Sequence, residues 1–154
     1  MNFNPNQPLA RVGSPTPQTV IFKSESHKLH QAFPVAKDSG VTKTIVPGQP
    51  VKLNEDGTIE GYFGTGVYLG IAVTSSDNAP YPEGALGKEV TVMVEAFAVV
   101  YGVSSASVKA GYVSPEKVEK DSQYVTYKES ATQTDFIAIS TASEAKELVQ
   151  VIIK

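Results

Sequence analysis

Cysteine and tryptophan are absent from this chain of 154 residues, and histidine occurs only twice. A chain without cysteine forms no disulfide, has no cysteine nucleophile and offers no thiolate to a metal. The two histidines, His27 and His30, stand close together with no acidic cluster beside them. We therefore predict that they are solvent-exposed and hold no metal, and we expect no cofactor.

Long hydrophobic runs and an excess of positive charge are missing as well. The longest nearly apolar stretch, residues 96–103, is too short to span a bilayer. The first residues, 1–8, have neither the basic start nor the apolar centre of a signal peptide. The net charge is −3 and the lysines are scattered, so no electrostatic footprint for nucleic acid is present. We expect a soluble protein with neither nucleic acid nor membrane as a partner.

Patterns of catalytic residues are also lacking. There is no Gly-x-Ser-x-Gly motif, and the paired carboxylates lie in segments typical of turns. The glycine-rich segment Gly61–Gly66 neither opens a helix nor carries the lysine of a phosphate-binding loop, so it indicates a hairpin or bulge. We expect no enzyme and no small-molecule substrate. A small enzyme would need a pocket that holds His27 or His30 against a carboxylate.

A set of short strands that occurs twice is the main positive signal. In the first copy the three segments are residues 45–53, 69–75 and 90–94; in the second they are residues 108–113, 136–141 and 148–153. The matched segments are offset by about 63, 66 and 59 residues, so the strands recur in order while the loops differ in length. This pattern predicts an all-β fold, a small β-barrel or β-tulip-like fold built from a duplicated strand module.

Alternation of apolar and polar residues predicts individual strands. Val67–Val73 is apolar at every second position, and residues 90–98 alternate in the same way, which predicts one strand in each case. Glu55–Gly57 is typical of a hairpin turn. Ser114–Lys117 resembles a turn or a short helical entry, and Ser143–Glu147 is too short for a stable helix and predicts a turn.

Proline marks the start of the chain as an extended arm. Residues 1–18 contain four prolines among Asn, Gln, Ser and Thr, which excludes a helix or a central strand. We assign residues 1–34 to an N-terminal arm and residues 35–154 to the barrel. A flexible tail is the alternative interpretation. The apolar residues that could anchor such an arm on a partner are Phe3, Leu9, Val12, Ile21 and Phe22.

A long polar loop over residues 75–89 is the second candidate for binding. Loops of this length without their own secondary structure are often binding loops. Its candidate contact residues are Asn78, Tyr81 and Leu86. With Tyr81 as a stacking surface, they would fit a head-fibre or host-surface module that binds carbohydrate. This is the alternative function that the residues leave open.

The order of strands and glycines resembles the capsid decoration proteins of tailed bacteriophages, which are also called cement or head-stabilisation proteins. The residues that carry the resemblance are Gly48-x-Pro50-Val51-x-Leu53, the turn Asp56-Gly57, Gly70-Ile71-Ala72, and Val90-x-Val92-x-Val94 after a polar loop. The second copy follows with Phe136–Ile139 and Leu148–Val151. The resemblance covers residues 41–154.

The resemblance implies a non-enzymatic structural protein on the outer surface of the phage capsid. Its partner would be the major capsid protein, and it would stabilise the expanded head. Proteins of this family are often homotrimers, and many use an extended N-terminal arm, for which the proline-rich start is suited. The implied location is the virion, after synthesis in the cytoplasm of the host bacterium.

Overall fold

The computed structural model describes residues 20–22, 29–77, 88–94, 98–119 and 122–154, and within these ranges it contains strands and no helix. The predicted all-β fold is confirmed. The strands are β1 (Val20–Phe22), β2 (Leu29–Pro34), β3 (Lys37–Asp38), β4 (Val41–Thr42), β5 (Pro50–Leu53), β6 (Ile59–Gly61), β7 (Val67–Ala72), β8 (Glu89–Val94), β9 (Ala98–Ser104), β10 (Gly111–Val118), β11 (Val125–Glu129), β12 (Phe136–Ala138) and β13 (Leu148–Ile153).

The first half of the chain forms a five-stranded sheet, which we call the N-terminal unit. Its strand order is β2-β8-β7-β5-β6, and all neighbours are antiparallel. A parallel bridge between Val35 and Ile59 joins the two outer strands, and the Ala36 amide donates to the Ile59 carbonyl at 2.9 Å. The sheet therefore curls until its two edges meet.

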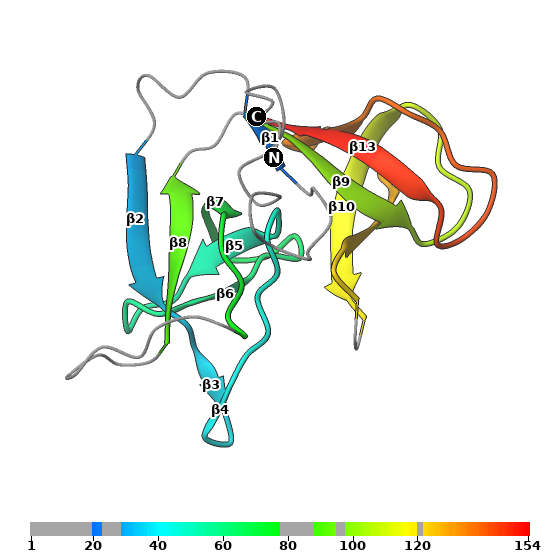
Figure 1. Ribbon diagram of the computed structural model, residues 1–154. Helices are drawn as coiled ribbons and strands as arrows, with labels where there is room; N and C mark the ends of the chain where they lie inside the picture. Colours follow the sequence, from blue (N-terminus) through cyan, green and yellow to red (C-terminus); the bar gives the residue numbers. More distant parts are fainter. Residues whose placement is uncertain (1–19, 23–28, 78–87, 95–97, 120–121) are drawn as a thin grey trace, which may run out of the picture.

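The second half forms a closed five-stranded barrel, which we call the C-terminal unit. Its strand order is β9-β13-β12-β10-β11, again antiparallel. Parallel pairing between β11 and β9, with Thr126 opposite Val103, closes the ring. The short strand β1 pairs with residues 98–100 of β9, which precede the part of β9 that pairs with β11. Figure 1 shows the two units beside each other.

The two units have the same connectivity. The five strands of one unit correspond in chain order to those of the other: β2, β5, β6, β7 and β8 to β9, β10, β11, β12 and β13. In both units, a parallel contact between the first and the third of these strands closes the sheet. The repeat predicted from the sequence is thus a repeat of structure. The matched segments of the sequence fall on β5 and β10, on β7 and β12, and on β8 and β13.

Two buried clusters form the core of the described part of the chain. One lies inside the N-terminal unit and contains Val51, Ile59 and Val92 among others. The other fills the C-terminal barrel around Tyr127 and also includes Val46, Ile71 and Met93 from the N-terminal unit. Because residues of both units share this second cluster, the two units are packed against each other.

Three local expectations need correction. Residues 90–98 are not one strand: β8 ends at Val94 in one sheet, and β9 begins at Ala98 in the other. Ser114–Lys117 lies within β10 instead of a turn, because Pro115 stands at a bulge opposite β11, where a missing amide donor is tolerated. Residues 29–34, assigned to the arm, form β2 and pair with β8 along six positions.

Candidate binding surfaces

The N-terminal segment joins the body through β1. Of the predicted arm anchors, Ile21 stands opposite Val99 and Phe22 opposite Ala98 on β9. The arrangement attaches the start of the chain to the rim of the C-terminal unit by main-chain pairing. The side chains of β1 and the other three predicted anchors, Phe3, Leu9 and Val12, lie outside the described residues.

The predicted carbohydrate loop has a well-defined beginning. The buried Ser76 hydroxyl accepts from the Ile45 amide at 2.8 Å, and the Ser76 amide donates to the Ile45 carbonyl at 3.0 Å. These bonds fix the chain where it leaves the N-terminal unit. The candidate contacts Asn78, Tyr81 and Leu86 lie outside the described residues, so their role stays a prediction.

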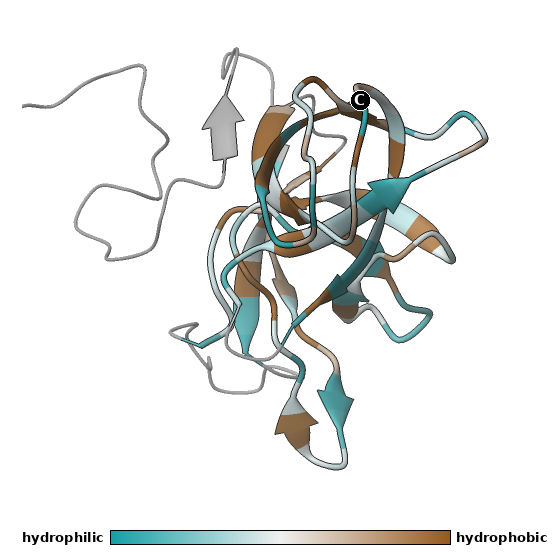
Figure 2. Ribbon diagram, turned by 90° about the vertical axis from the view of Figure 1, so that its right-hand side faces the viewer, coloured by the Kyte–Doolittle hydropathy of each residue, from teal (hydrophilic) through white to brown (hydrophobic). Residues whose placement is uncertain are grey.

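A two-stranded hairpin, β3–β4, projects from the N-terminal unit (Figure 1). Its turn uses Ser39 and Gly40, both with positive φ (49° and 81°), and the Lys43 amide closes its base on the Ala36 carbonyl at 2.9 Å. Val41 on β4 is 70% exposed. In Figure 2 the hairpin lies at the lower end, with one hydrophobic and one hydrophilic strand. Our sequence analysis missed it, although Asp38-Ser39-Gly40 is a turn signal.

An ion-pair cluster lies at the base of this hairpin. Glu60 on β6 pairs with Lys43 and, at 3.1 Å, with Lys52 on β5. The hydrogen bond from Lys43 is the largest cause that lowers the pKa of the Glu60 carboxyl. Nearby, Asp56 accepts from the Thr58 amide and hydroxyl at 3.0 and 2.6 Å, which confirms the predicted turn. The Glu60 carboxylate is thus neutralised by two lysines, and the Asp56 carboxylate stabilises the turn.

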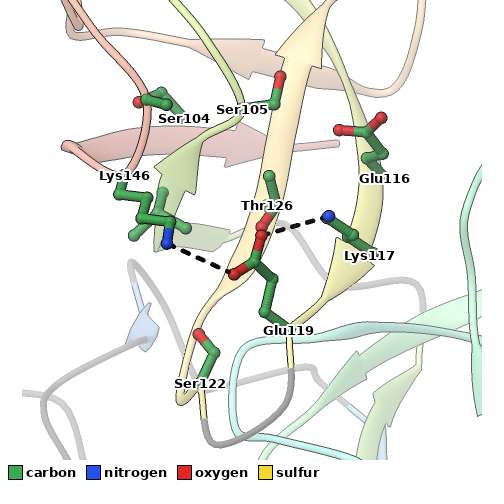
Figure 3. A pocket seen from close by; sticks show the side chains of 10 residues that line it. Ser104, Ser105, Glu116, Lys117, Glu119, Ser122, Thr126 and Lys146 are labelled. Atoms are coloured by element: carbon green, nitrogen blue, oxygen red, sulfur yellow. Dashed lines mark ion pairs between the residues drawn. The ribbon is translucent and has the colours of Figure 1, made fainter.

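A hollow of about 570 Å³, lined mostly by serine, threonine and charged residues, lies on the C-terminal unit (Figure 3). Glu119 pairs there with Lys117 at 3.2 Å and with Lys146 at 3.9 Å. The Ser104 hydroxyl donates to the Glu144 carbonyl at 2.6 Å, so it serves the backbone of the next loop. All three charged side chains are substantially exposed, which makes them a solvated network. No group of three or more metal-ligating side chains occurs among the residues that the structure describes.

The tyrosines at the predicted glycine-rich turn face the protein interior. Gly64 and Gly66 have positive φ, as a turn requires, and Tyr62 and Tyr68 flank it. Both rings contact Phe136 of the C-terminal unit, at centroid distances of 6.1 and 5.9 Å. Burial raises the pKa of the Tyr68 hydroxyl. These rings pack the N-terminal unit against the C-terminal unit.

Among the described residues, His30 lies on β2 and is exposed, as predicted, whereas His27 lies outside them. No helix in the described part of the chain is long and apolar enough to cross a membrane. The chain matches no protein-family model and no curated protein.

Proposed function

We propose that this protein is a non-enzymatic virion component that binds the outer surface of a bacteriophage capsid and stabilises the expanded head. The resemblance to capsid decoration proteins rests on segments that are neighbouring strands in the structure, β5, β7 and β8, and on their counterparts β10, β12 and β13. The major capsid protein is the proposed partner.

The observation that best supports this proposal is the attachment of β1. Its pairing with β9 places residue 20 at the rim of the C-terminal unit. Nineteen residues precede this point, and four of them are proline. An extended chain advances about 3.3 Å per residue, so such a segment could reach roughly 60 Å from the rim. We propose that the segment uses this reach to contact a neighbouring capsid subunit.

The physics of the proposed function requires no chemical step. A protein that binds only the expanded lattice stabilises it by mass action, and many copies act together. An arm that becomes ordered on contact loses conformational entropy, which apolar anchors offset. In this scheme Phe3, Leu9 and Val12 would occupy apolar pockets on the capsid, while the N-terminal and C-terminal units stay rigid.

Co-sedimentation with expanded heads tests the proposal. We expect the variant Phe3→Ser/Leu9→Ser/Val12→Ser to bind at least about tenfold more weakly than the unmodified protein, since each buried apolar side chain contributes about 1.5–3 kcal/mol. The matched control is Asn4→Ser/Asn6→Ser/Gln7→Ser, which changes three polar residues of the same segment and should bind normally.

Two results would count against the proposal. Equal binding by both variants and the unmodified protein would remove the arm from the mechanism. Failure of the unmodified protein to bind expanded heads at all would remove the function itself. Circular dichroism of each variant checks that the strand body is unchanged.

A further inference from the structure

An apolar row crosses the outer face of the C-terminal barrel. Strand pairing places Tyr112 beside Ile137, Ile137 beside Ile152, and Ile152 beside Val99. Tyr112, Ile137 and Ile152 are at least partly exposed and alternate with buried positions of their strands, so they face away from the barrel interior, whereas Val99 at the end of the row is buried. Tyr112 is 39% exposed.

The surface around this row is apolar too. Ile139 and Leu148 point to the same side and are 45% and 56% exposed. Gln150 interrupts the surface, and its amide nitrogen donates to the Tyr101 hydroxyl at 2.9 Å. The outer face of a strand in a solvated barrel ordinarily carries polar residues. An exposed face with this many apolar side chains indicates an interaction site.

The repeat indicates what covers such a row. In the N-terminal unit the corresponding row is Pro50, Ile71, Met93 and His30, joined by the same strand pairings. Ile71 and Met93 are 0% exposed. They belong to the cluster that fills the C-terminal barrel and lie outside the cluster of their own unit. In the first copy of the module, the row is therefore buried by the next unit.

We propose that the outer row of the C-terminal unit, centred on Ile137 and Ile152, is a docking surface for a second copy of this chain. Its counterpart, Ile71 and Met93, already packs against a β-unit of the same connectivity. A second copy offers such a unit in its own N-terminal half. The resulting contact joins different faces of the two copies, so it is heterologous.

This docking does not depend on the capsid surface proposed above. It requires only that one β-unit covers the row of another, as occurs inside the chain. The test therefore uses the purified protein alone. Loss of capsid binding with self-association intact would overturn the proposed function and leave this inference standing.

Sedimentation velocity over a concentration series tests the docking. We expect the full chain to associate, with a weight-average mass that rises above the 16.4 kDa of one copy. Ile137→Thr/Ile152→Thr should weaken association at least tenfold, because both side chains lose apolar contact while β propensity is kept. The matched control is Val67→Thr, which changes a valine that is 66% exposed on β7, outside the row.

Three results would overturn the inference. They are a full chain that stays monomeric at all concentrations, a double variant that associates as well as the full chain, and association that is lost in Val67→Thr to the same extent. If the double variant fails to fold, Ile139→Lys and Leu148→Lys carry the same test, because both side chains are exposed. Deleting residues 1–18 should leave association in place.

The absence of cysteine allows a direct test of the contact mode. In a variant with the single change Ile139→Cys, a two-fold contact whose axis passes close to position 139 would bring two copies of this residue together and give a disulfide-linked dimer under oxidising conditions. A heterologous contact keeps the two thiols apart, so we expect no such dimer. Efficient formation of it would contradict the proposed mode.

Discussion

Among the residues that the structure describes, Tyr127 has the largest fully buried side chain, and it lies in the core of the C-terminal barrel. Its space exists because residue 102 on the neighbouring strand β9 is glycine. A Cβ atom at this position would lie 2.4 Å from Cδ2 of Tyr127 and 2.9 Å from the Val125 carbonyl oxygen. The strands β9 and β11 can therefore close the barrel around Tyr127 only because residue 102 has no side chain.

Substituting Gly102→Ala should therefore destabilise the fold by about 1–3 kcal/mol, the usual effect of overpacking a core. Chemical denaturation measures the change. Leucine at position 127 has no ring and should relieve the clash with the methyl group added at position 102. The double variant Gly102→Ala/Tyr127→Leu should therefore lose less free energy of unfolding than the sum of the losses in the two single variants. Additive losses would contradict the proposed contact.

Glu60 makes a pH-dependent contribution to stability. Its two lysine partners, Lys43 first, hold the pKa of its carboxyl below the ordinary 4.5. The folded state therefore favours the charged form, and this stabilisation is present above about pH 5 and lost as the pH falls through the lowered pKa. Glu60→Gln should cost about 0.5 kcal/mol at pH 7, since the pair is partly exposed.

Thermal unfolding at several pH values checks this prediction. The difference in stability between Glu60→Gln and the unmodified protein should shrink between pH 5 and pH 3. Glu55→Gln, in the neighbouring turn and exposed, is the control and should show little effect at either pH. A difference that stays constant down to pH 3 would argue against charge as its cause.

At the scale of the elements, alternation in the sequence predicts strands well where one face is buried and the other is not. Alternation predicted β7, the repeat predicted β13, and the Glu55–Gly57 pattern predicted the turn before β6. Alternation failed over residues 90–98. Apolar residues stand at every even-numbered position through this segment, although β8 ends at Val94 in one sheet and β9 begins at Ala98 in the other. It also failed at Pro115, because a bulge in β10 is set by pairing with β11, which is distant in sequence.

The candidate site could be predicted only in part for the same reason. Composition pointed to a proline-rich arm and a polar loop, but the outer row of the C-terminal unit arises from pairing. Tyr112, Ile137 and Ile152 become neighbours only when three separate strands align. Each of them looks like an ordinary strand residue in the sequence. The burial of Ile71 and Met93 by a second unit likewise carries no local signal.

The hairpin β3–β4 should be dispensable for folding. Its residues lie outside both core clusters, and Val41 is exposed. Replacing residues 37–42 by Asn-Gly should change the free energy of unfolding by no more than about 1 kcal/mol, because shortening a surface loop has a small entropic effect. Thermal denaturation measures this change. A loss of cooperative unfolding would show that the hairpin supports the N-terminal unit.

At the scale of the whole molecule, the two units share one core, so we expect them to unfold together. Ile71 and Met93 cross from one unit into the cluster of the other, and Tyr62 and Tyr68 contact Phe136 beside them. A shared cluster of this kind couples the stability of both halves.

Met93→Ala should lower the stability of the whole chain by about 2–5 kcal/mol, because it opens a cavity between the units. Fluorescence of the tyrosines and far-UV circular dichroism should report one coincident transition before and after the change. Leu148→Ala, at an exposed position, is the control and should stay within about 0.5 kcal/mol. Two separate transitions in the unmodified protein would contradict the shared core.

The proposed adhesion to a capsid lattice can be tested by quantitative mass spectrometry of purified particles from the source that encodes the chain. If the protein decorates the head, it should occur in a fixed, high ratio to the major capsid protein, and only in particles with expanded heads. Absence from the particles, or a few copies per particle, would contradict this function.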